Sequence, residues 1–247
     1  MRHFVAGALS LLVLPLISTP AERPEPADSV PPSALSATQI VDEIARHNTA
    51  RNEDLKHYQS LRHYEVRYRG FTANLDAKMD VAVDYSAATG KSFHIVSQSG
   101  SRFLCDKVLK RAVDSEEEAQ KDPDATALTP ANYRFTLDGH DSVNGRPAYV
   151  LDVEPIAPSK FLYKGKIWVD AGDFAVEKIE ATPAKNPSFW IAQTLIHYTS
   201  ARNGEFWLPQ QNSSETRVRV GGKAVLTIDY GAYQIVPQVA AASVESR

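Results

Sequence analysis

The chain of 247 residues carries 27 lysines and arginines against 30 aspartates and glutamates, which gives a formal net charge of −3. This mild acidity gives no support to nucleic-acid binding, which requires a clustered basic face. A single cysteine excludes an intramolecular disulfide, and a hydrophobic content of 43% is enough for a packed core in one large domain or two small ones.

The N-terminus has the layout of a secretory signal peptide. A basic start at Arg2 and His3 precedes an apolar run over residues 4–17, and small residues follow near Ala21. The run is too short for a comfortable membrane span. We therefore expect residues 1–21 to direct export and to be cleaved, which leaves a soluble protein.

Hydrophobic periodicity predicts the elements of the first half. Residues 22–37 are polar and rich in proline, and we expect a flexible leader there. A helix follows from a cap at Thr38 to about residue 60. Alternating apolar and polar residues then predict three strands, at 64–69, 78–85 and 91–98. The helical period returns over 102–121, where Cys105 lies on the apolar stripe and is expected to be a buried hydrophobe.

Everything after residue 130 is strand-like. The predicted strands cover 133–137, 147–154, 160–170, 174–181, 188–200, 211–220 and 223–235. Turn signals such as Asn144-Gly145 and Asn203-Gly204 separate them, and strands joined by short turns pair antiparallel. About ten such strands in one meander accumulate twist and leave long edges, so the sheet is expected to curl. The predicted fold class is α+β, a curved antiparallel sheet forming an incomplete β-barrel covered by two or three helices.

Strand alternation assigns side chains to the concave side of this barrel. It selects eleven residues of the strands and of the inserted helix as a hydrophobic ligand-binding set: Val81, Val83, Phe93, Ile95, Leu104, Val108, Leu109, Phe135, Leu137, Tyr149 and Leu151. Tyr64, Leu226 and Ile228 belong to the same predicted lining. A one-residue error in register would turn a whole strand outward. The alternative to a cavity is a packed core that these side chains and the helices fill.

The stretch NPSFWIAQTLIHYT, residues 186–199, has apolar side chains on both faces of its predicted strand. One face belongs to the barrel interior. We expect the other to be covered by the N-terminal helix or by a partner protein, because exposed apolar patches usually have a use. Phe189, Trp190 and Ile191 are therefore grouped as a partner or cavity contact.

Motifs for catalysis and cofactor binding are missing from the sequence. It contains no GxSxG, HExxH or nucleotide-binding glycine pattern. His57, His63 and Glu65 come closest to a metal cluster, but their spacing crosses a boundary between helix and strand, which favours surface histidines. Asp170 and Asp173 are expected to bond backbone groups of the DAGD turn. We predict no catalytic residue, no metal and no cofactor.

Three stretches of the second half form a recognisable succession. They are GRPAYVLDVEP at 145–155, KFLYKGKIWVDAGDFAVEKIEATPAKNPSFW at 160–190 and GEFWLPQQNSSETRV at 204–218. Together with the leading helix they make residues 38–236 resemble bacterial outer-membrane lipoprotein-sorting proteins, the LolA-like group of periplasmic lipoprotein carriers. The resemblance implies one domain, an incomplete barrel closed by helices, whose apolar interior holds acyl chains without enzymatic activity or cofactor. Residues 237–247 are expected to be a disordered tail.

The resemblance also implies location and partners. It predicts a monomeric periplasmic chaperone for transport that binds lipoprotein acyl chains or other lipids, with inner-membrane donor and outer-membrane acceptor proteins and no nucleic acid. In well-studied carriers an arginine holds the helical lid closed, but no arginine of this chain lies in a matching motif. Some relatives sense lipid or mislocalised protein, so an envelope-stress regulator that uses the same barrel is the alternative.

Overall fold

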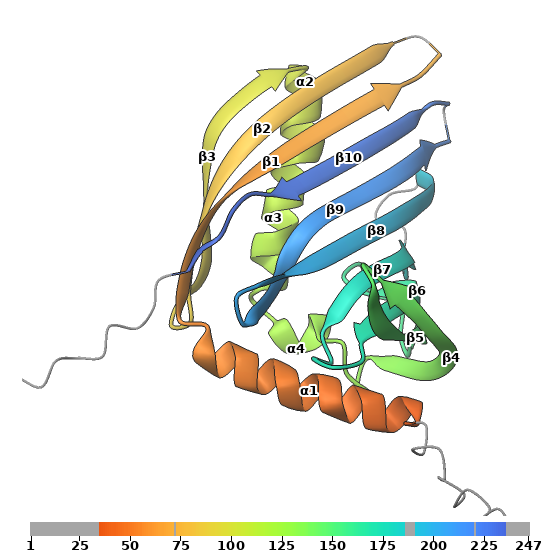
Figure 1. The fold of residues 1–247 in the computed structure, drawn as a ribbon. Coiled ribbons are helices and arrows are strands. Elements are labelled where there is room, and N and C mark those ends of the chain that lie inside the picture. The colour runs from red at the N-terminus through yellow and green to blue at the C-terminus, as the bar shows by residue number, and fades with distance from the viewer. Residues whose placement is uncertain (1–34, 72, 186–190, 220, 236–247) are drawn as a thin grey trace, which may run out of the picture. The chain divides into compact units, whose positions relative to one another are not determined.

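One antiparallel sheet organises the computed structural model, which describes residues 35–71, 73–185, 191–219 and 221–235. All of them fall within the unit Leu35–Arg247. The strands are β1 His57–Arg69, β2 Asn74–Ser86, β3 Gly90–Gly100, β4 Tyr133–Val143, β5 Arg146–Pro155, β6 Tyr163–Asp170, β7 Val176–Pro183, β8 Ile191–Asn203, β9 Phe206–Val218, β10 Lys223–Tyr230 and β11 Gln234–Ile235. Their order is β3-β2-β1-β10-β9-β8-β7-β6-β5-β4, with β11 beside β1, and the sheet twists strongly from β8 to β7 (Figure 1). The predicted open, curved antiparallel sheet is confirmed.

The strand order differs from one continuous meander. β3 and β4 do not pair but form the two edges of the sheet, and β1 pairs with β10 so that Arg69 lies opposite Lys223. The chain passes from one edge to the other through its second helical segment. The prediction of a simple meander was wrong at this point because sequence periodicity carries no information on which distant strands pair.

The helices are α1 Ala37–Asp54, α2 Arg102–Leu104, the π-helical turn η1 Cys105–Leu109, α3 Lys110–Ala119 and α4 Pro123–Thr126. Ser36, not Thr38, caps α1: its hydroxyl accepts the N–H of Gln39, whose side chain accepts the N–H of Ser36 in return. The helix was also predicted too long. Residues 57–60 belong to β1, where Tyr58 and Ser60 are buried as alternate residues of the strand.

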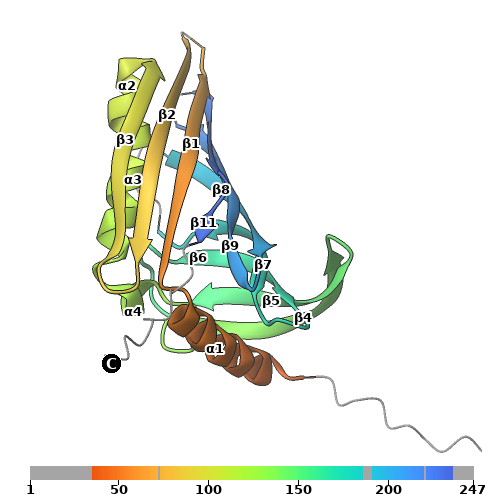
Figure 2. The ribbon, with the colours of Figure 1, turned by 60° about the vertical axis from the view of Figure 1, so that its left-hand side comes forward.

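Two hydrophobic cores lie between the helices and one face of the sheet, which we call the inner face. The first core joins α2, η1 and α3 to β1, β2 and β10, and includes the buried Cys105 as predicted. The second joins Ile40, Val41 and Ile44 of α1 to β4, β5 and β6. Figure 2 shows α2 and α3 running alongside β3. The helices therefore cover the two ends of the strand order, and β8 and β9 lie between them.

Gly100 sets the start of the second helical segment. Its φ is +88°, and a Cβ at this position would lie 2.3 Å from the carbonyl oxygen of Asp76. Only glycine tolerates this combination of positive φ and close backbone approach. The chain can thus leave β3 sharply, and Ser101 caps α2 through its bond to the N–H of Leu104.

Candidate functional site

A pocket of about 430 Å³ opens between α3 and the inner face of β8, β9 and β10. It is lined by Ala112, Ser115, Glu116, Ala119, Lys160, Phe161, Thr194, Ile196, Asn212, Ser214, Leu226, Ile228 and Tyr230. The strand register explains this lining, because Ile196 lies opposite Ser214 and Ser214 lies opposite Leu226. Directly paired residues point to the same face of a sheet. The pocket therefore belongs to the inner face and occupies the space between the two cores.

The walls of this pocket combine apolar and polar side chains. Leu226, Ile228 and Phe161 supply apolar surface, whereas Asn212 and Ser214 supply uncharged hydrogen-bonding groups and the lining also includes the charged Glu116 and Lys160. Concavities that combine apolar walls with placed polar groups are typical of small-molecule sites, which span about 300–1,000 Å³. The arrangement offers apolar surface for a hydrocarbon chain next to polar and charged groups.

Arg62 of β1 forms an ion pair with Glu116 of α3, the helix that borders the pocket. The side chain is 1% exposed, and its Nη1 donates to Glu116 Oε2 of α3 at 2.7 Å. The other oxygen of Glu116 accepts a bond from Lys91 Nζ at 2.8 Å. Sequence reasoning did not find this arginine. The available signal was its place in the alternation, because Arg62 stands at an inward position between Ser60 and Tyr64.

The surroundings keep this ion pair charged. Burial lowers the pKa of Arg62, but the Glu116 carboxylate and the nearby Tyr230 outweigh it, so the pKa lies above its ordinary value. Burial raises the pKa of Glu116, but Lys91 and Arg62 outweigh it, so that pKa is lowered. The contact is therefore an ion pair at neutral pH and not a neutral hydrogen bond.

Aromatic rings enclose the guanidinium. Its central carbon lies 4.6 Å from the ring centroid of Tyr230 and 5.5 Å from that of Phe93, within cation–π range. Arg62 Nε and the neighbouring Tyr64 Oη are buried donors that have no hydrogen-bond acceptor in the part of the chain that the structure describes. Burial raises the pKa of the Tyr64 hydroxyl, which keeps it a neutral donor.

The eleven predicted ligand-binding residues are distributed over the two cores. Val81, Val83, Phe93, Ile95, Leu104, Val108 and Leu109 pack in the first core, and Phe135, Leu137, Tyr149 and Leu151 pack in the second. None of them belongs to the lining of the 430 Å³ pocket. Their role as ligand contacts stays a prediction. Leu226 and Ile228, which alternation also placed on the concave side, do line the pocket.

The structure describes only part of the predicted strand at 188–200, which has apolar side chains on both faces. Phe189 and Trp190 lie outside the described residues, and Ile191 begins β8 opposite Val218. Further along β8, Ile196 lines the inner pocket, while Leu195 is on the other face and is 38% exposed.

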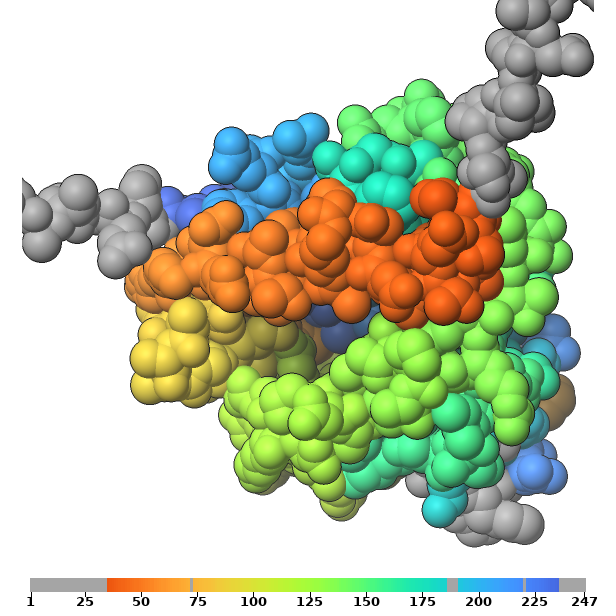
Figure 3. All heavy atoms as spheres, turned by 90° about the horizontal axis from the view of Figure 1, so that it is seen from below, coloured from red at the N-terminus to blue at the C-terminus, as the bar shows by residue number. Residues whose placement is uncertain are grey.

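A second pocket, of about 230 Å³, lies beneath the C-terminal end of α1. Tyr198 and Ser200 of β8 line it, and they continue the inward row that Thr194 and Ile196 begin in the first pocket. Figure 3 shows the surface hollowed between α1 and α3, on the side where the inner face opens. The two pockets thus follow the inner face of one strand.

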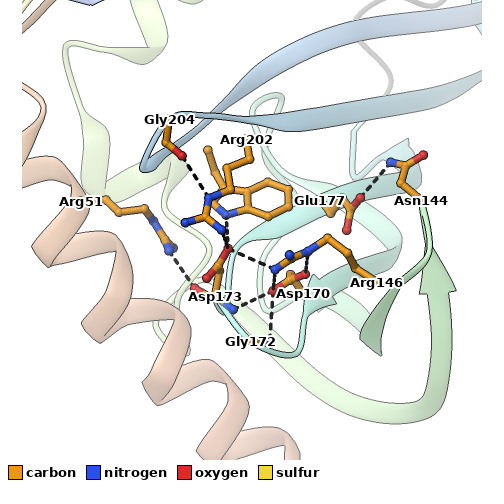
Figure 4. Close-up of polar contacts among 10 residues, drawn as sticks. Arg51, Asn144, Arg146, Asp170, Gly172, Asp173, Glu177, Arg202 and Gly204 are labelled. Carbon is orange, nitrogen blue, oxygen red and sulfur yellow. Dashed lines mark hydrogen bonds and ion pairs between the residues drawn. The ribbon is translucent and has the colours of Figure 1, made fainter.

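Polar contacts fix α1 at this end of the molecule (Figure 4). The buried Asp170 carboxylate accepts bonds from Arg146 and from the backbone N–H groups of Gly172 and Asp173 at 3.0 and 2.6 Å, as predicted for Asp170. The same prediction was wrong for Asp173, whose carboxylate accepts bonds from the side chains of Arg146 and Trp207 because it points away from the turn backbone toward these donors. Burial raises the pKa of Asp170, but these donors outweigh it and hold the pKa low. From α1, Arg51 Nη1 donates to the backbone oxygen of Asp173 at 2.7 Å. The cluster is a structural brace that ties α1 to the turn between β6 and β7.

The histidines of the predicted surface group pair with carboxylates. His57 Nε2 lies 3.1 Å from Asp84, and His63 Nδ1 lies 2.6 Å from Asp80. Within the described ranges, no group of three or more His, Cys, Asp and Glu side chains is arranged to hold a metal ion. No helix in the same ranges combines the length and the apolar character needed to span a bilayer.

Comparison with known proteins gives structural neighbours only. No family model and no curated protein matches the chain. Solved structures that resemble it include the LolA superfamily protein NE2245 from Nitrosomonas europaea, with 13% identity, a TM-score of 0.38 and coverage of 82% of this chain and 94% of that one. A putative outer-membrane lipoprotein-sorting protein domain from Vibrio parahaemolyticus has 13% identity and a TM-score of 0.41, covering 81% and 93%. The MucA/MucB complex of Pseudomonas aeruginosa has 13% identity and a TM-score of 0.25, covering 81% and 100%.

These neighbours include the group that the sequence motifs resemble, LolA superfamily and lipoprotein-sorting proteins.

Proposed function

We propose that this protein is a non-enzymatic periplasmic carrier that holds acyl chains of lipoproteins or related lipids in the pocket between α3 and β8–β10, for sorting to the outer membrane. The observation that supports this most directly is the position of the pocket. It lies on the inner face between two cores, with Leu226, Ile228 and Phe161 on its walls. The signal-like N-terminus and the lipoprotein-sorting motifs of the sequence support the location and the ligand class.

The energetics of such a site are those of reversible binding. Each buried methylene contributes about 0.8 kcal/mol, so a chain of ~16 carbons offers on the order of 12 kcal/mol before association and ordering costs of ~4 to 15 kcal/mol. The net affinity is then moderate. A carrier needs such an affinity because it must release its ligand to an acceptor.

The Arg62–Glu116 pair supplies a means of opening. It connects β1 to α3, and α3 forms one wall of the pocket. Separation of this pair would free α3 to move away from β8–β10 and widen the pocket. The pair then has the role that the lid arginine has in the carriers that the sequence resembles.

The test begins with the mature protein extracted without detergent from its native compartment. Mass spectrometry of the purified protein is expected to find bound lipid or lipoprotein, and the delipidated protein is expected to bind a fluorescent fatty-acyl probe. Protein that carries no lipid and binds no acyl probe would contradict the carrier. Capture of a partner protein together with that result would instead support the envelope-stress regulator.

A further inference from the structure

The charges next to the pocket are not balanced. Arg62 and Lys91 share one carboxylate, that of Glu116, through bonds of 2.7 and 2.8 Å. Within the described part of the chain neither cation has a second carboxylate partner. Lys160, which lines the pocket, is paired with Glu118. The inner cluster therefore has a net positive charge, and a buried charge of one sign favours an ion of the other.

Two unpartnered donors stand beside this charge. Among the described residues, Arg62 Nε has no hydrogen-bond partner and the hydroxyl of Tyr64, which lies beside Arg62, donates to no acceptor; both residues are 1% exposed. Both belong to the inner face of β1, two residues apart. A buried donor without a partner costs stability, and a bound ion or water is one arrangement that removes this cost.

The strand register connects these donors to the pocket. On β10, Tyr230 lies opposite Arg62 and Ile228 lies opposite Tyr64. Tyr230 and Ile228 both line the pocket. The donors are thus one strand away from the pocket wall.

The aromatic rings restrict how a ligand can meet the arginine. Tyr230 and Phe93 lie near the guanidinium at 4.6 and 5.5 Å from their ring centroids. Its N–H groups point outward in the plane of the guanidinium, and this fork matches the oxygens of a carboxylate or a phosphate. A neutral ester or a hydroxyl would use the site less well, because neither would compensate the positive charge.

We propose that the inner end of the pocket is an anion subsite, formed by Arg62 Nε and Tyr64 Oη, for the carboxylate or phosphate of a single acidic lipid. The acyl chain of that lipid lies along Leu226, Ile228 and Ile196. This inference rests on the proposed function as a lipid carrier. It adds that the ligand is an acidic lipid that enters with its charged group foremost, and not a hydrocarbon chain alone.

The first experiment compares ligands that have the same chain and different head groups. Hexadecanoic acid, hexadecyl phosphate and hexadecanol compete with a fluorescent acyl probe on the delipidated mature protein at pH 8, where the carboxylate is ionised. The acid or the phosphate is expected to bind about tenfold or more tightly than the alcohol, as a charge-assisted hydrogen bond allows. The stronger of the two anions identifies the source, a free fatty acid or a phosphorylated lipid.

The second experiment removes one donor. Arg62→Gln also removes the buried ion pair with Glu116 and is expected to destabilise the fold, so Tyr64→Phe is the better variant because it removes one oxygen only. It is expected to weaken binding of the preferred anion about tenfold and to leave hexadecanol unchanged. The matched control is Tyr68→Phe on the same strand, whose hydroxyl already donates to the backbone oxygen of Gly221 at 2.9 Å.

The outcomes separate the subsite from the carrier. Equal affinity for alcohol, acid and phosphate would overturn the anion subsite and leave the carrier intact. An anion preference that Tyr64→Phe does not reduce would also overturn it. If none of the three ligands displaces the probe and no lipid copurifies with the protein, the carrier function itself fails.

Discussion

Arg62 of β1 and Glu116 of α3 are joined by a hydrogen-bonded ion pair at 2.7 Å, although 54 residues separate them along the chain. The arginine is buried and the glutamate is 27% exposed. Because α3 also forms a wall of the inner pocket, this pair connects β1 to a wall of the pocket.

Glu116→Gln is expected to lower the free energy of unfolding by about 1–3 kcal/mol, because Arg62 stays charged and buried without its counter-ion. Urea unfolding followed by circular dichroism measures the change. Glu117→Gln is the matched control, since Glu117 is the exposed neighbour on α3. Equal stability of the two variants would show that the pair contributes nothing to the fold.

The pH dependence of this pair follows from the lowered pKa of Glu116. A carboxyl whose pKa is lower in the folded state contributes stability above its unfolded pKa, about 4.3 for glutamate, and loses this contribution as the pH falls through the folded pKa. The difference in unfolding free energy between wild type and Glu116→Gln is therefore expected to be full at pH 7 and to shrink below about pH 4. A difference that is constant from pH 7 to pH 3 would contradict the ionic origin.

Ser214→Trp is expected to fill the inner pocket and to reduce acyl-probe binding about tenfold or more, because the indole occupies the volume of the ligand. Ser214 lines the pocket, whereas the adjacent Ser213 of β9 does not. Ser213→Trp places the same side chain on the opposite face of the sheet and is the control. Titration with the acyl probe measures the binding affinity of both folded variants. Unchanged binding by Ser214→Trp would exclude this pocket as the acyl site.

Glu177→Gln is expected to stabilise the protein by about 1 kcal/mol at pH 8 and by less at pH 4. Glu177 is 2% exposed, one of its oxygens has no hydrogen-bond partner among the described residues, and burial raises its pKa. An acid with a raised folded pKa favours folding at low pH and loses this contribution as the pH rises through that value. Thermal unfolding at both pH values measures the effect, and a lower melting temperature for the variant at pH 8 would contradict it.

The local patterns of the chain predicted most of the elements correctly. Alternation located the strands because successive side chains of a strand point to opposite faces, so a half-buried strand alternates apolar and polar residues. Turn residues such as Asn144 and Gly145, both at positive φ, marked where the strands reverse. The burial of Cys105 and the bonds of Asp170 within its turn are also local properties. They required no knowledge of distant partners.

The site itself depended on contacts between distant segments. Inward orientation was predicted well for Leu226 and Ile228, but periodicity could not tell which inward residues pack under a helix and which border a pocket. Val83 and Leu151 face inward and pack in the first and second cores, respectively. Ser214 lines the pocket, but it was not predicted as a ligand contact because it is small and polar.

The sequence by itself therefore determined the α+β class, the strand faces and the resemblance to lipoprotein-sorting proteins, since these rest on spacing within short segments. Only the tertiary structure decided that β1 pairs with β10, that α1 and α3 cover different parts of the inner face, and that a pocket lies between them. It also decided that Arg62 meets Glu116. The physical reason is that pairing and packing depend on the summed energies of many contacts between remote residues, which no local period records.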